Sequence, residues 1–457
     1  MKRISSLIAQ IVLSIVSLAS FSSCASNSYT KAIPVNSTAI MAIDAQAIKQ
    51  EDNDLLKSIA SLLNVSDISE CGLDFTQDIY MFETSDGNLG TCIKVNDEGS
   101  IEQWLKTLGQ KGLCSKTINK RDFTFALVHD SWEIGYSDKA FLMLGPILPA
   151  QQADAIRNIR KYLKQVSEGS DKLSPLLEKL DSIEGPMRLV AQIDAMPDKL
   201  SAPFTLVQPE NADCSQIILA ASMEKTNSKN IIINGNLFSF NKSVDKGIKL
   251  NLDKLKPTEG KYVMNIPSNT LCTIFMNVSG NDLVNMTHNS KQLGTILAGI
   301  NTAIDMDNIL RCTNGDFVLS IDAFSDTSAS MSMAANLESR NFLKDVDYWK
   351  KSCPSGSSIE DYGKNSYKLR TPDVSFWFGA TESNEFFGST NEHKAASILK
   401  QCSNPYPKEV LNEIKGKKLC MVVNMSQIFK QTQGESDTAN FLAPLFGKAE
   451  NIIFGIK

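Results

Sequence analysis

The amino-acid sequence predicts an α+β protein that contains a duplicated domain of mixed, mainly antiparallel sheets with helices packed on one face. Short apolar or alternating runs are typical of strands, and amphipathic stretches typical of helices lie between them. The same order of elements then recurs later in the chain. The repeat distance of roughly 230 residues is far longer than the ~20–50 residues of solenoid repeats, so it indicates a duplicated domain.

The first copy alternates several predicted strands with three predicted helices. In the helix around Trp104, the apolar residues Ile101, Trp104 and Leu108 share one face. The alternation within 122–128 is typical of a half-buried strand. The predicted strands are 39–44, 79–82, 91–95, 122–128, 132–136 and 140–145, and the predicted helices are 55–63, 101–108 and 151–166.

The second copy begins with a segment, 265–270, that matches 32–37 around an Ile-Pro pair. Its helix around Trp349 matches the Trp104 helix. Its predicted strands are 273–278, 315–321, 330–335, 367–369, 374–379 and 385–388, and its predicted helices are 293–300, 342–349 and 395–402. Further strands are expected at 188–193, 216–222, 230–237, 418–423 and 452–456, with a turn at 225–229 and a helix within 426–446.

These elements predict six consecutive segments. The segments are a lipoprotein signal peptide at 1–23, a polar tether at 24–32, the first copy at 33–185, a β-rich middle segment at 186–262, the second copy at 263–405 and a strand-helix-strand segment at 406–457.

The N-terminus has the features of an export signal. A basic start, Met1-Lys2-Arg3, precedes an uncharged apolar run at 4–20 and small residues before Cys24. This pattern resembles a bacterial lipobox, in which the cysteine is acylated and becomes the mature N-terminus. An uncleaved anchor helix or an ordinary signal peptide cut nearby remain the alternatives. No acidic run follows Cys24, which favours the periplasmic leaflet of the outer membrane over the cell surface.

Composition excludes several classes of protein. With 42% hydrophobic and 21% charged residues among 457, the chain is neither disordered nor a polytopic membrane protein. Its net charge of −5 argues against a nucleic-acid partner.

Several short motifs follow the lipobox, namely Ile33-Pro34, Ile43-Asp44, Gly72-Leu73-Asp74 and the run 78–82. In these motifs and the lipobox the chain resembles a family of uncharacterised secreted lipoproteins found in Gram-negative, gut-type bacteria. The resemblance implies export and a shared fold. It implies no activity, because the family has no assigned catalytic residues to transfer.

Motifs for catalysis, cofactors and metals are missing from the sequence. The ten cysteines show no CxxC spacing and the three histidines no HExxH or HxH spacing, so we expect no metal or cofactor. Cysteine spacing leaves one or two disulfides open. His129-Asp130-Ser131 are consecutive, which predicts a turn rather than a catalytic triad. Acidic pairs such as Glu133/Asp138 and Glu382/Glu385 are the weak alternative signal for a glycosidase.

Two sets of residues remain as candidate sites. Trp132, Tyr136, Trp377 and Phe386 occupy matching strands, where they form either core or, if exposed, a stacking platform for a ligand. Asp181-Ser182-Ile183 and Asp437-Thr438-Ala439 resemble O-glycosylation acceptors of gut-bacterial envelopes, which makes Ser182 and Thr438 candidate modification sites.

The sequence therefore predicts a lipid-anchored envelope protein with a non-enzymatic binding or structural role. Its expected partners are the membrane, through the lipid on Cys24, and an envelope protein or a glycan. The alternative is an envelope or polysaccharide hydrolase with an acidic site that no motif marks. A cleft lined by two carboxylates with raised pKa values would favour the hydrolase, whereas a shallow aromatic-lined face would favour binding.

Overall fold

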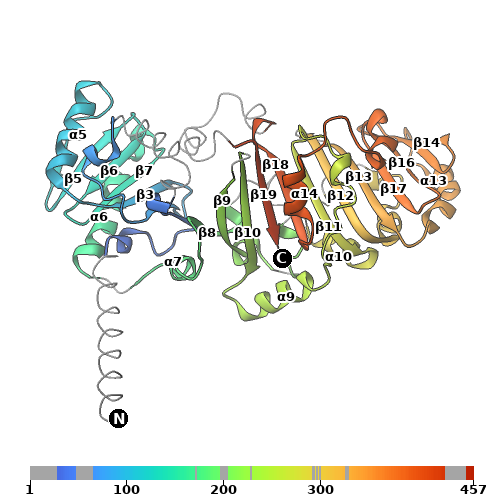
Figure 1. Cartoon of the computed structure of the whole chain (residues 1–457), viewed down its shortest axis with the longest axis horizontal. Coiled ribbons are helices and arrows are strands. Elements are labelled where there is room, and N and C mark those ends of the chain that lie inside the picture. Colours follow the sequence, from blue (N-terminus) through green and yellow to red (C-terminus); the bar gives the residue numbers. More distant parts are fainter. Residues whose placement is uncertain are drawn as a thin grey trace, which may run out of the picture. The chain divides into compact units, whose positions relative to one another are not determined.

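The protein folds into two compact units that meet in sequence between Val190 and Ala191 (Figure 1). Unit 1 contains the described residues up to Val190, and unit 2 contains those from Ala191 onward. Both combine helices with a mainly antiparallel sheet, so the predicted α+β class is confirmed. The computed structural model describes residues 28–47, 65–169, 172–195, 204–210, 212–226, 229–290, 294, 297, 300–324, 329–427 and 449–456.

Unit 1 is built on a sheet with the strand order β8-β1-β2-β3-β7-β6-β5-β4. All strand pairs from β1 to β4 are antiparallel, and β8 pairs with the other edge of β1. The strands are β1 (Ala39–Ile43), β2 (Ile79–Glu83), β3 (Leu89–Lys94), β4 (Ile118–Lys120), β5 (Phe123–Val128), β6 (Trp132–Tyr136), β7 (Ala140–Gly145) and β8 (Met187–Gln192).

The helices of unit 1 form where the sequence supplies caps and an apolar face. Asp97 caps α5 by accepting a hydrogen bond from the Ser100 amide at 2.7 Å. The helix then buries Ile101, Trp104 and Leu108, as predicted. The helical segments are η1 (Ser28–Ala32), η2 (Ile68–Cys71), α5 (Glu98–Gln110), η3 (Pro149–Gln151), α6 (Gln152–Ser167) and α7 (Pro175–Leu180).

Helices cover both faces of the sheet, so the expectation that they pack on one face is wrong. On one face Trp104 of α5 meets Phe141 of β7, with ring centroids 6.1 Å apart. On the other face a Cβ at Gly135 would lie 2.6 Å from Ile159 of α6. The cause is visible in β7, where Phe141 and Met143 lie on one face of the sheet and Leu142 and Leu144 on the other. Strands that are apolar at both alternating positions need cover on both faces.

Unit 2 contains a longer sheet with the order β9-β10-β19-β18-β11-β12-β13-β17-β16-β15-β14. Its pairings are antiparallel except β10 with β19, which is parallel. β9 and β10 pair directly, with Ile231 opposite Lys225, and the predicted turn at 225–229 lies partly outside the described residues. The strands are β9 (Ile218–Lys225), β10 (Asn230–Phe238), β11 (Cys272–Ser279), β12 (Thr313–Phe324), β13 (Ala329–Leu337), β14 (Ser358–Gly363), β15 (Ser366–Arg370), β16 (Ser375–Ala380), β17 (Glu385–Ser389), β18 (Leu419–Asn424) and β19 (Asn451–Ile456).

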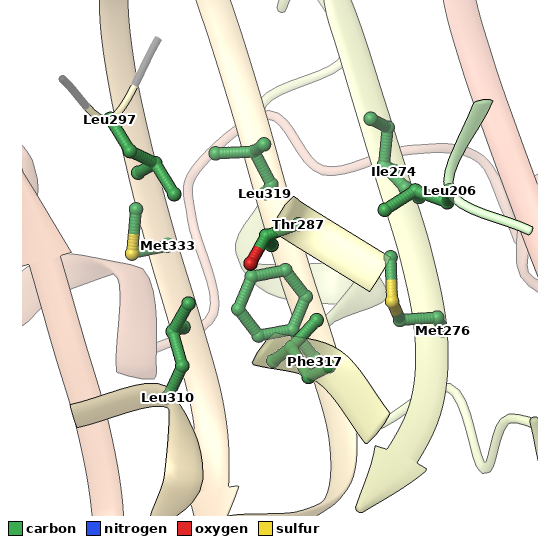
Figure 2. A pocket seen from close by; sticks show the side chains of 10 residues that line it. Leu206, Ile274, Met276, Thr287, Leu297, Leu310, Phe317, Leu319 and Met333 are labelled. Atoms are coloured by element: carbon green, nitrogen blue, oxygen red, sulfur yellow. The ribbon is translucent and has the colours of Figure 1, made fainter. Parts of the chain in front are cut away.

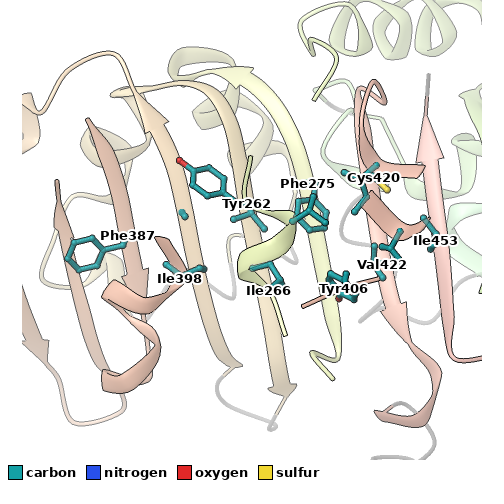
Figure 3. Close-up of a cluster of buried hydrophobic side chains, with 14 of the residues drawn as sticks. Tyr262, Ile266, Phe275, Phe387, Ile398, Tyr406, Cys420, Val422 and Ile453 are labelled. Carbon is teal, nitrogen blue, oxygen red and sulfur yellow. The ribbon is translucent and has the colours of Figure 1, made fainter. Parts of the chain in front are cut away.

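Helical segments also lie on both faces of this sheet. One face carries a large buried cluster, in which Tyr262, Phe275 and Tyr406 pack with Val422 (Figure 3). On the other face Trp349 of α13 contacts Phe378, with ring centroids 6.4 Å apart. The segments are η4 (Ile193–Ala195), η5 (Cys214–Gln216), α9 (Lys242–Leu252), η6 (Val263–Asn265), α10 (Gly280–Asn289), α12 (Met306–Arg311), η7 (Asn341–Lys344), α13 (Val346–Ser352), η8 (Glu392–Lys394), η9 (Ala396–Leu399) and α14 (Lys408–Ile414).

Seven strands follow the same order in both units. The order β1-β2-β3-β7-β6-β5-β4 in unit 1 corresponds to β11-β12-β13-β17-β16-β15-β14 in unit 2. One line of directly paired residues crosses five strands of each sheet. The two lines are Ala42, Tyr80, Cys92, Leu142 and Gly135 in unit 1, and Phe275, Val318, Ala334, Phe387 and Gly379 in unit 2.

Unit 1 includes residues that the sequence assigned to the polar tether. Residues 28–32, expected in the polar tether, form η1, and Tyr29 and Ala32 are buried. The phenol of Tyr29 donates a hydrogen bond to the Asp78 carbonyl at 2.8 Å. The predicted helix at 55–63 and most of the one within 426–446 lie outside the described residues. In the part that is described, no helix has both the length and the apolar composition to cross a bilayer.

Candidate functional site

The four aromatic residues considered for a stacking platform are all buried. Trp132 and Tyr136 of β6 expose 8% and 2% of their surface, and Trp377 and Phe386 expose 8% and 1%. Trp377 and Phe386 also point to opposite faces of the sheet. Directly paired residues share a face, and Phe386 pairs with Ala380, which lies three residues after Trp377 and therefore on the other face. Of the two alternatives, core or exposed platform, the burial of all four residues agrees with the core.

The candidate modification sites fall in different parts of the chain. Cys24 and Thr438 lie outside the described residues. Ser182 is exposed directly after α7, and its hydroxyl donates a hydrogen bond to the Lys179 carbonyl at 2.7 Å. Acylation of Cys24 and glycosylation of Ser182 and Thr438 therefore stay predictions.

The cysteines and histidines are dispersed in the structure. The nine cysteines that the structure describes are free thiols, and Cys92, Cys272 and Cys420 are buried in strands. No group of three or more His, Cys, Asp or Glu suited to a metal ion occurs in the described ranges. His129 and Asp130 have positive φ angles of 49° and 59°, so the predicted turn between β5 and β6 is confirmed.

The acidic pairs considered for a hydrolase have unsuitable surroundings. Glu133 is enclosed in the core of unit 1, where burial raises its pKa and Gln152 donates a hydrogen bond at 3.1 Å. At Glu385, burial alone would raise the pKa, but hydrogen bonds from Lys261 and Ser383 outweigh it and lower the pKa. A hydrogen bond from Lys364 lowers the pKa of Glu382. Neither Glu382 nor Glu385 therefore suits a general acid near neutral pH.

A polar cluster in unit 2 fastens the chain before η6 to the sheet. The buried carboxylate of Asp316 accepts hydrogen bonds from the amides of Glu259 and Lys261 at 3.0 and 2.9 Å. The Asn277 side chain donates a third at 3.1 Å. Tyr262 adds a hydrogen bond to Asn336 at 2.9 Å. Because its donors come mainly from backbone and neighbouring strands, we interpret this cluster as structural.

An apolar pocket lies between the sheet of unit 2 and the helices on one face (Figure 2). About 400 Å³ between its walls is free of atoms, including space open to solvent. Its one hydroxyl, on Thr287, donates to the Val284 carbonyl at 2.8 Å and is thus occupied. Such a wall offers packing but no polar group to orient a ligand. The lining residues are Leu206, Ile274, Met276, Leu283, Thr287, Leu297, Leu310, Phe317, Leu319 and Met333.

A second pocket in unit 2, here called the open groove, is open to solvent and mostly polar. It encloses about 830 Å³, including space open to solvent, between the end of α10, the start of α12 and one side of α13. The ring of Tyr348 is 70% exposed at its wall. Trp349, the next residue, is buried and attaches α13 to the sheet through its contact with Phe378. The lining residues are His288, Asn301, Thr302, Ala303, Ile304, Asp305, Asp307, Tyr348, Trp349 and Ser352.

The polar side chains of this open groove are held in place by short contacts. His288 Nε2 lies 2.9 Å from Asp307 Oδ2, and Arg311 lies 3.8 Å from the same oxygen. Asp305 caps α12 by accepting from the Asn308 amide at 3.1 Å. The groove thus presents oriented carboxylate, amide and imidazole groups beside an exposed aromatic ring. Sequence analysis missed it, because the residues come from three separate segments and only Trp349 belonged to a predicted pattern.

Comparison with known proteins defines the class of this molecule. A family model described as a domain of unknown function (DUF4836) matches residues 45–433, so the chain belongs to that family. The match agrees with the resemblance to an uncharacterised family. No curated protein matches the chain.

Two solved structures of a protein called TP0453 are similar over much of the chain. They are its crystal forms I and III, with 6% and 5% sequence identity and a TM-score of 0.25 each. The similarity covers 82% and 81% of this chain and 97% and 96% of the other.

Proposed function

We propose that this protein is a lipid-anchored component of the cell envelope that binds a glycan and catalyses no reaction. The anchor is the acylated Cys24, held in the periplasmic leaflet of the outer membrane. The observation that carries the binding role is the open groove of unit 2, where the exposed Tyr348 ring stands beside Asp307, His288 and Asn301.

The chemistry of the groove suits a polyhydroxylated ligand. An exposed aromatic ring can stack on the apolar face of a sugar, while carboxylates and amides hydrogen-bond to its hydroxyls. His288 holds the Asp307 carboxylate at one oxygen, which leaves the other oxygen available as an acceptor. The groove is open, so it can receive a chain of sugars as well as a single ring.

The hydrolase alternative has less support from the same groove. Its carboxylates are already engaged, since Asp305 caps α12 and Asp307 is paired with His288 and Arg311. A glycosidase needs one carboxyl that remains protonated near neutral pH, which burial or a neighbouring carboxylate would provide. In the groove Asp307 instead contacts His288 and Arg311.

We also infer that units 1 and 2 derive from one duplicated domain. Support comes from the shared order of seven strands and from the matching lines of paired residues. Ala42 and Phe275 occupy equivalent positions on these lines. They have the same sequence separation as Ile33 and Ile266, which belong to the two matching Ile-Pro segments.

A binding measurement with matched variants tests the groove. The full chain would be titrated with soluble muropeptides and with a panel of neutral oligosaccharides. We expect Tyr348→Ala to weaken binding about five-fold or more, since an aromatic contact is worth roughly 1 kcal/mol beyond its area. Asp307→Asn should also weaken it. Tyr362→Ala, at an exposed tyrosine of β14 outside the groove, should bind as the parent does.

Failure to bind any member of the panel would contradict the glycan-binding role. Equal loss in Tyr348→Ala and Tyr362→Ala would place binding outside the groove. Release of reducing ends during incubation would instead support the hydrolase.

A further inference from the structure

Unit 1 includes residues that lie very close in sequence to the predicted lipid anchor. Cys24 and Ser28 are separated by four peptide steps, and Ser28 is the first residue of η1. Four residues span at most about 14 Å even when fully extended. An acylated Cys24 therefore holds the start of η1 within that distance of the bilayer surface, which is too short for unit 1 to stand clear of the membrane.

The start of η1 is firmly attached to unit 1. Tyr29 is buried, donates a hydrogen bond to the Asp78 carbonyl at 2.8 Å and lies 5.9 Å from the ring of Tyr80. The thiol of Cys92 donates to the Tyr29 carbonyl at 3.4 Å. Because these contacts tie η1 to β2 and β3, the anchor constrains the whole sheet of unit 1.

The helix beside η1 carries a basic face. η1 packs against α6, whose apolar side buries Ile159 and Leu163 against the sheet. A helix turns about 100° per residue, so the four basic side chains of α6 fall within an arc of about 100°. They lie on the side away from the core and are Arg157, Arg160, Lys161 and Lys164.

The acidic groups on this face are fewer and are weakly held. Asp154 lies 2.7 Å from Arg157, and Glu168 lies 2.9 Å from Lys164, all of them more than half exposed. Exposed pairs of this kind contribute little and exchange readily for other charges. Among the described residues, Arg160 and Lys161 have no ion-pair partner. The face keeps an excess of positive charge in a chain whose net charge is negative.

We propose that the basic face of α6 docks on the anionic headgroups of the leaflet that holds the lipid. The proposal rests on acylation of Cys24, which brings η1 to the membrane. The short connection from Cys24 to Ser28 limits the distance between unit 1 and the bilayer. The positive charge on α6 determines which surface of unit 1 faces the headgroups. Each basic side chain near an anionic surface strengthens membrane association roughly five-fold, and salt screens the effect.

Lysine footprinting of the lipidated full chain tests this docking. The protein would be reconstituted into vesicles of phosphatidylethanolamine with phosphatidylglycerol, or with phosphatidylcholine as the neutral control. A water-soluble acylating ester then labels exposed lysines, and mass spectrometry gives the rate at each position. We expect Lys161 and Lys164 to react several-fold more slowly on the anionic vesicles and to recover at high salt. Lys106, exposed on α5 on the opposite face of the sheet, should react equally on both.

A charge-reversed variant separates docking from general burial. Arg160→Glu combined with Lys161→Glu should remove the protection of Lys164, whereas Lys106→Glu with Lys116→Glu should preserve it. Equal labelling of Lys161 and Lys164 on anionic and neutral vesicles would overturn the proposal, while the acyl mass on the N-terminal peptide still supported the anchor. An N-terminal peptide without acyl mass would instead refute the lipid anchor, and the docking proposal with it.

Discussion

Units 1 and 2 share an order of seven strands, yet each secures it with different polar contacts. Asp78 in unit 1 and Asp316 in unit 2 stand at equivalent places, two residues before the paired Tyr80 and Val318. Asp78 forms an ion pair with Arg188 of β8. Asp316 instead accepts from the amides of Glu259 and Lys261. The comparison indicates that the apolar pattern sets the strand order, while the buried polar contacts are free to change.

The cover over the same sheet face also differs between the units. In unit 1 the single helix α6 spans Gln152–Ser167 and places Ile159 over Gly135. In unit 2 the short segments η8 and η9 follow β17, and Trp377 stands where unit 1 has Glu133. A long helix leaves a solvent-facing side that can carry charge, whereas short segments and a large aromatic residue fill the space locally.

The largest expected effect is the loss of a core aromatic at an equivalent position of each unit. Phe141 pairs with Tyr136 of β6, and Phe386 pairs with Ala380 of β16, the strand of unit 2 that corresponds to β6. Both phenylalanines are buried. We expect Phe141→Ala and Phe386→Ala each to lower the free energy of unfolding by about 3–5 kcal/mol. Hydrogen exchange in mild denaturant should show the loss in the substituted unit. A loss below about 1 kcal/mol at either position would contradict the equivalence of Phe141 and Phe386 as core residues of the two units.

Alanine at the corresponding glycines, Gly135 and Gly379, should lower the free energy of unfolding by a smaller amount, and by different amounts at the two positions. A Cβ at Gly135 would lie 2.6 Å from the side chain of Ile159, whereas one at Gly379 would lie 2.4 Å from the Asn365 carbonyl oxygen. Side chains yield more easily than backbone, so we expect Gly379→Ala to cost about 3 kcal/mol and Gly135→Ala about 1–2 kcal/mol. Denaturant titration measures both.

Gly294 provides the control for those two substitutions, since nothing lies within 4 Å of a Cβ there. It is helical, so Gly294→Ala should be neutral or stabilise by up to about 1 kcal/mol. Equal destabilisation by all three substitutions would contradict the close packing assigned to Gly135 and Gly379.

The smallest expected effect concerns the buried Glu133, whose counterpart Trp377 does not titrate. Burial raises the pKa of Glu133 above its usual 4.5, so the folded state binds the proton more tightly than the unfolded state. Protonated Glu133 therefore stabilises unit 1 fully below its usual pKa of 4.5, and this stabilisation is lost as the pH rises through the raised pKa. Glu133→Gln should remove this dependence and stabilise unit 1 by up to about 1 kcal/mol at neutral pH.

A pH series of thermal unfolding measures this effect, with Glu102→Gln on the exposed side of α5 as the control. Loss of the pH dependence in Glu102→Gln, with its retention in Glu133→Gln, would show that another group is responsible.

Local pattern in the sequence was enough to predict most strands and the α5 and α6 helices. The apolar spacing around Trp104 and the alternation in 122–128 are local signals, and the structure confirms both. The cover on the second sheet face was missed, although strands that are apolar at both alternating positions, such as β7, carry that information. η1 was assigned to the tether because its residues are polar by composition, and only the contacts of Tyr29 with β2 show that it is buried.

The candidate site was harder to predict than the fold. The open groove joins α10, α12 and α13, which are distant in sequence and carry no shared motif. The aromatics chosen from the sequence lie on strands, where large side chains serve the core. Tyr348 escaped notice because it adjoins the buried Trp349, although neighbouring residues of a helix point in different directions.

The most direct test of the account is hydrogen exchange on the lipidated full chain, with and without soluble muropeptides and neutral oligosaccharides. The account predicts slower exchange with the glycans at 280–289, 301–311 and 346–352 around the open groove, and unchanged exchange in unit 1. Glycan-induced protection confined to unit 1, or protection nowhere in the chain, would contradict it.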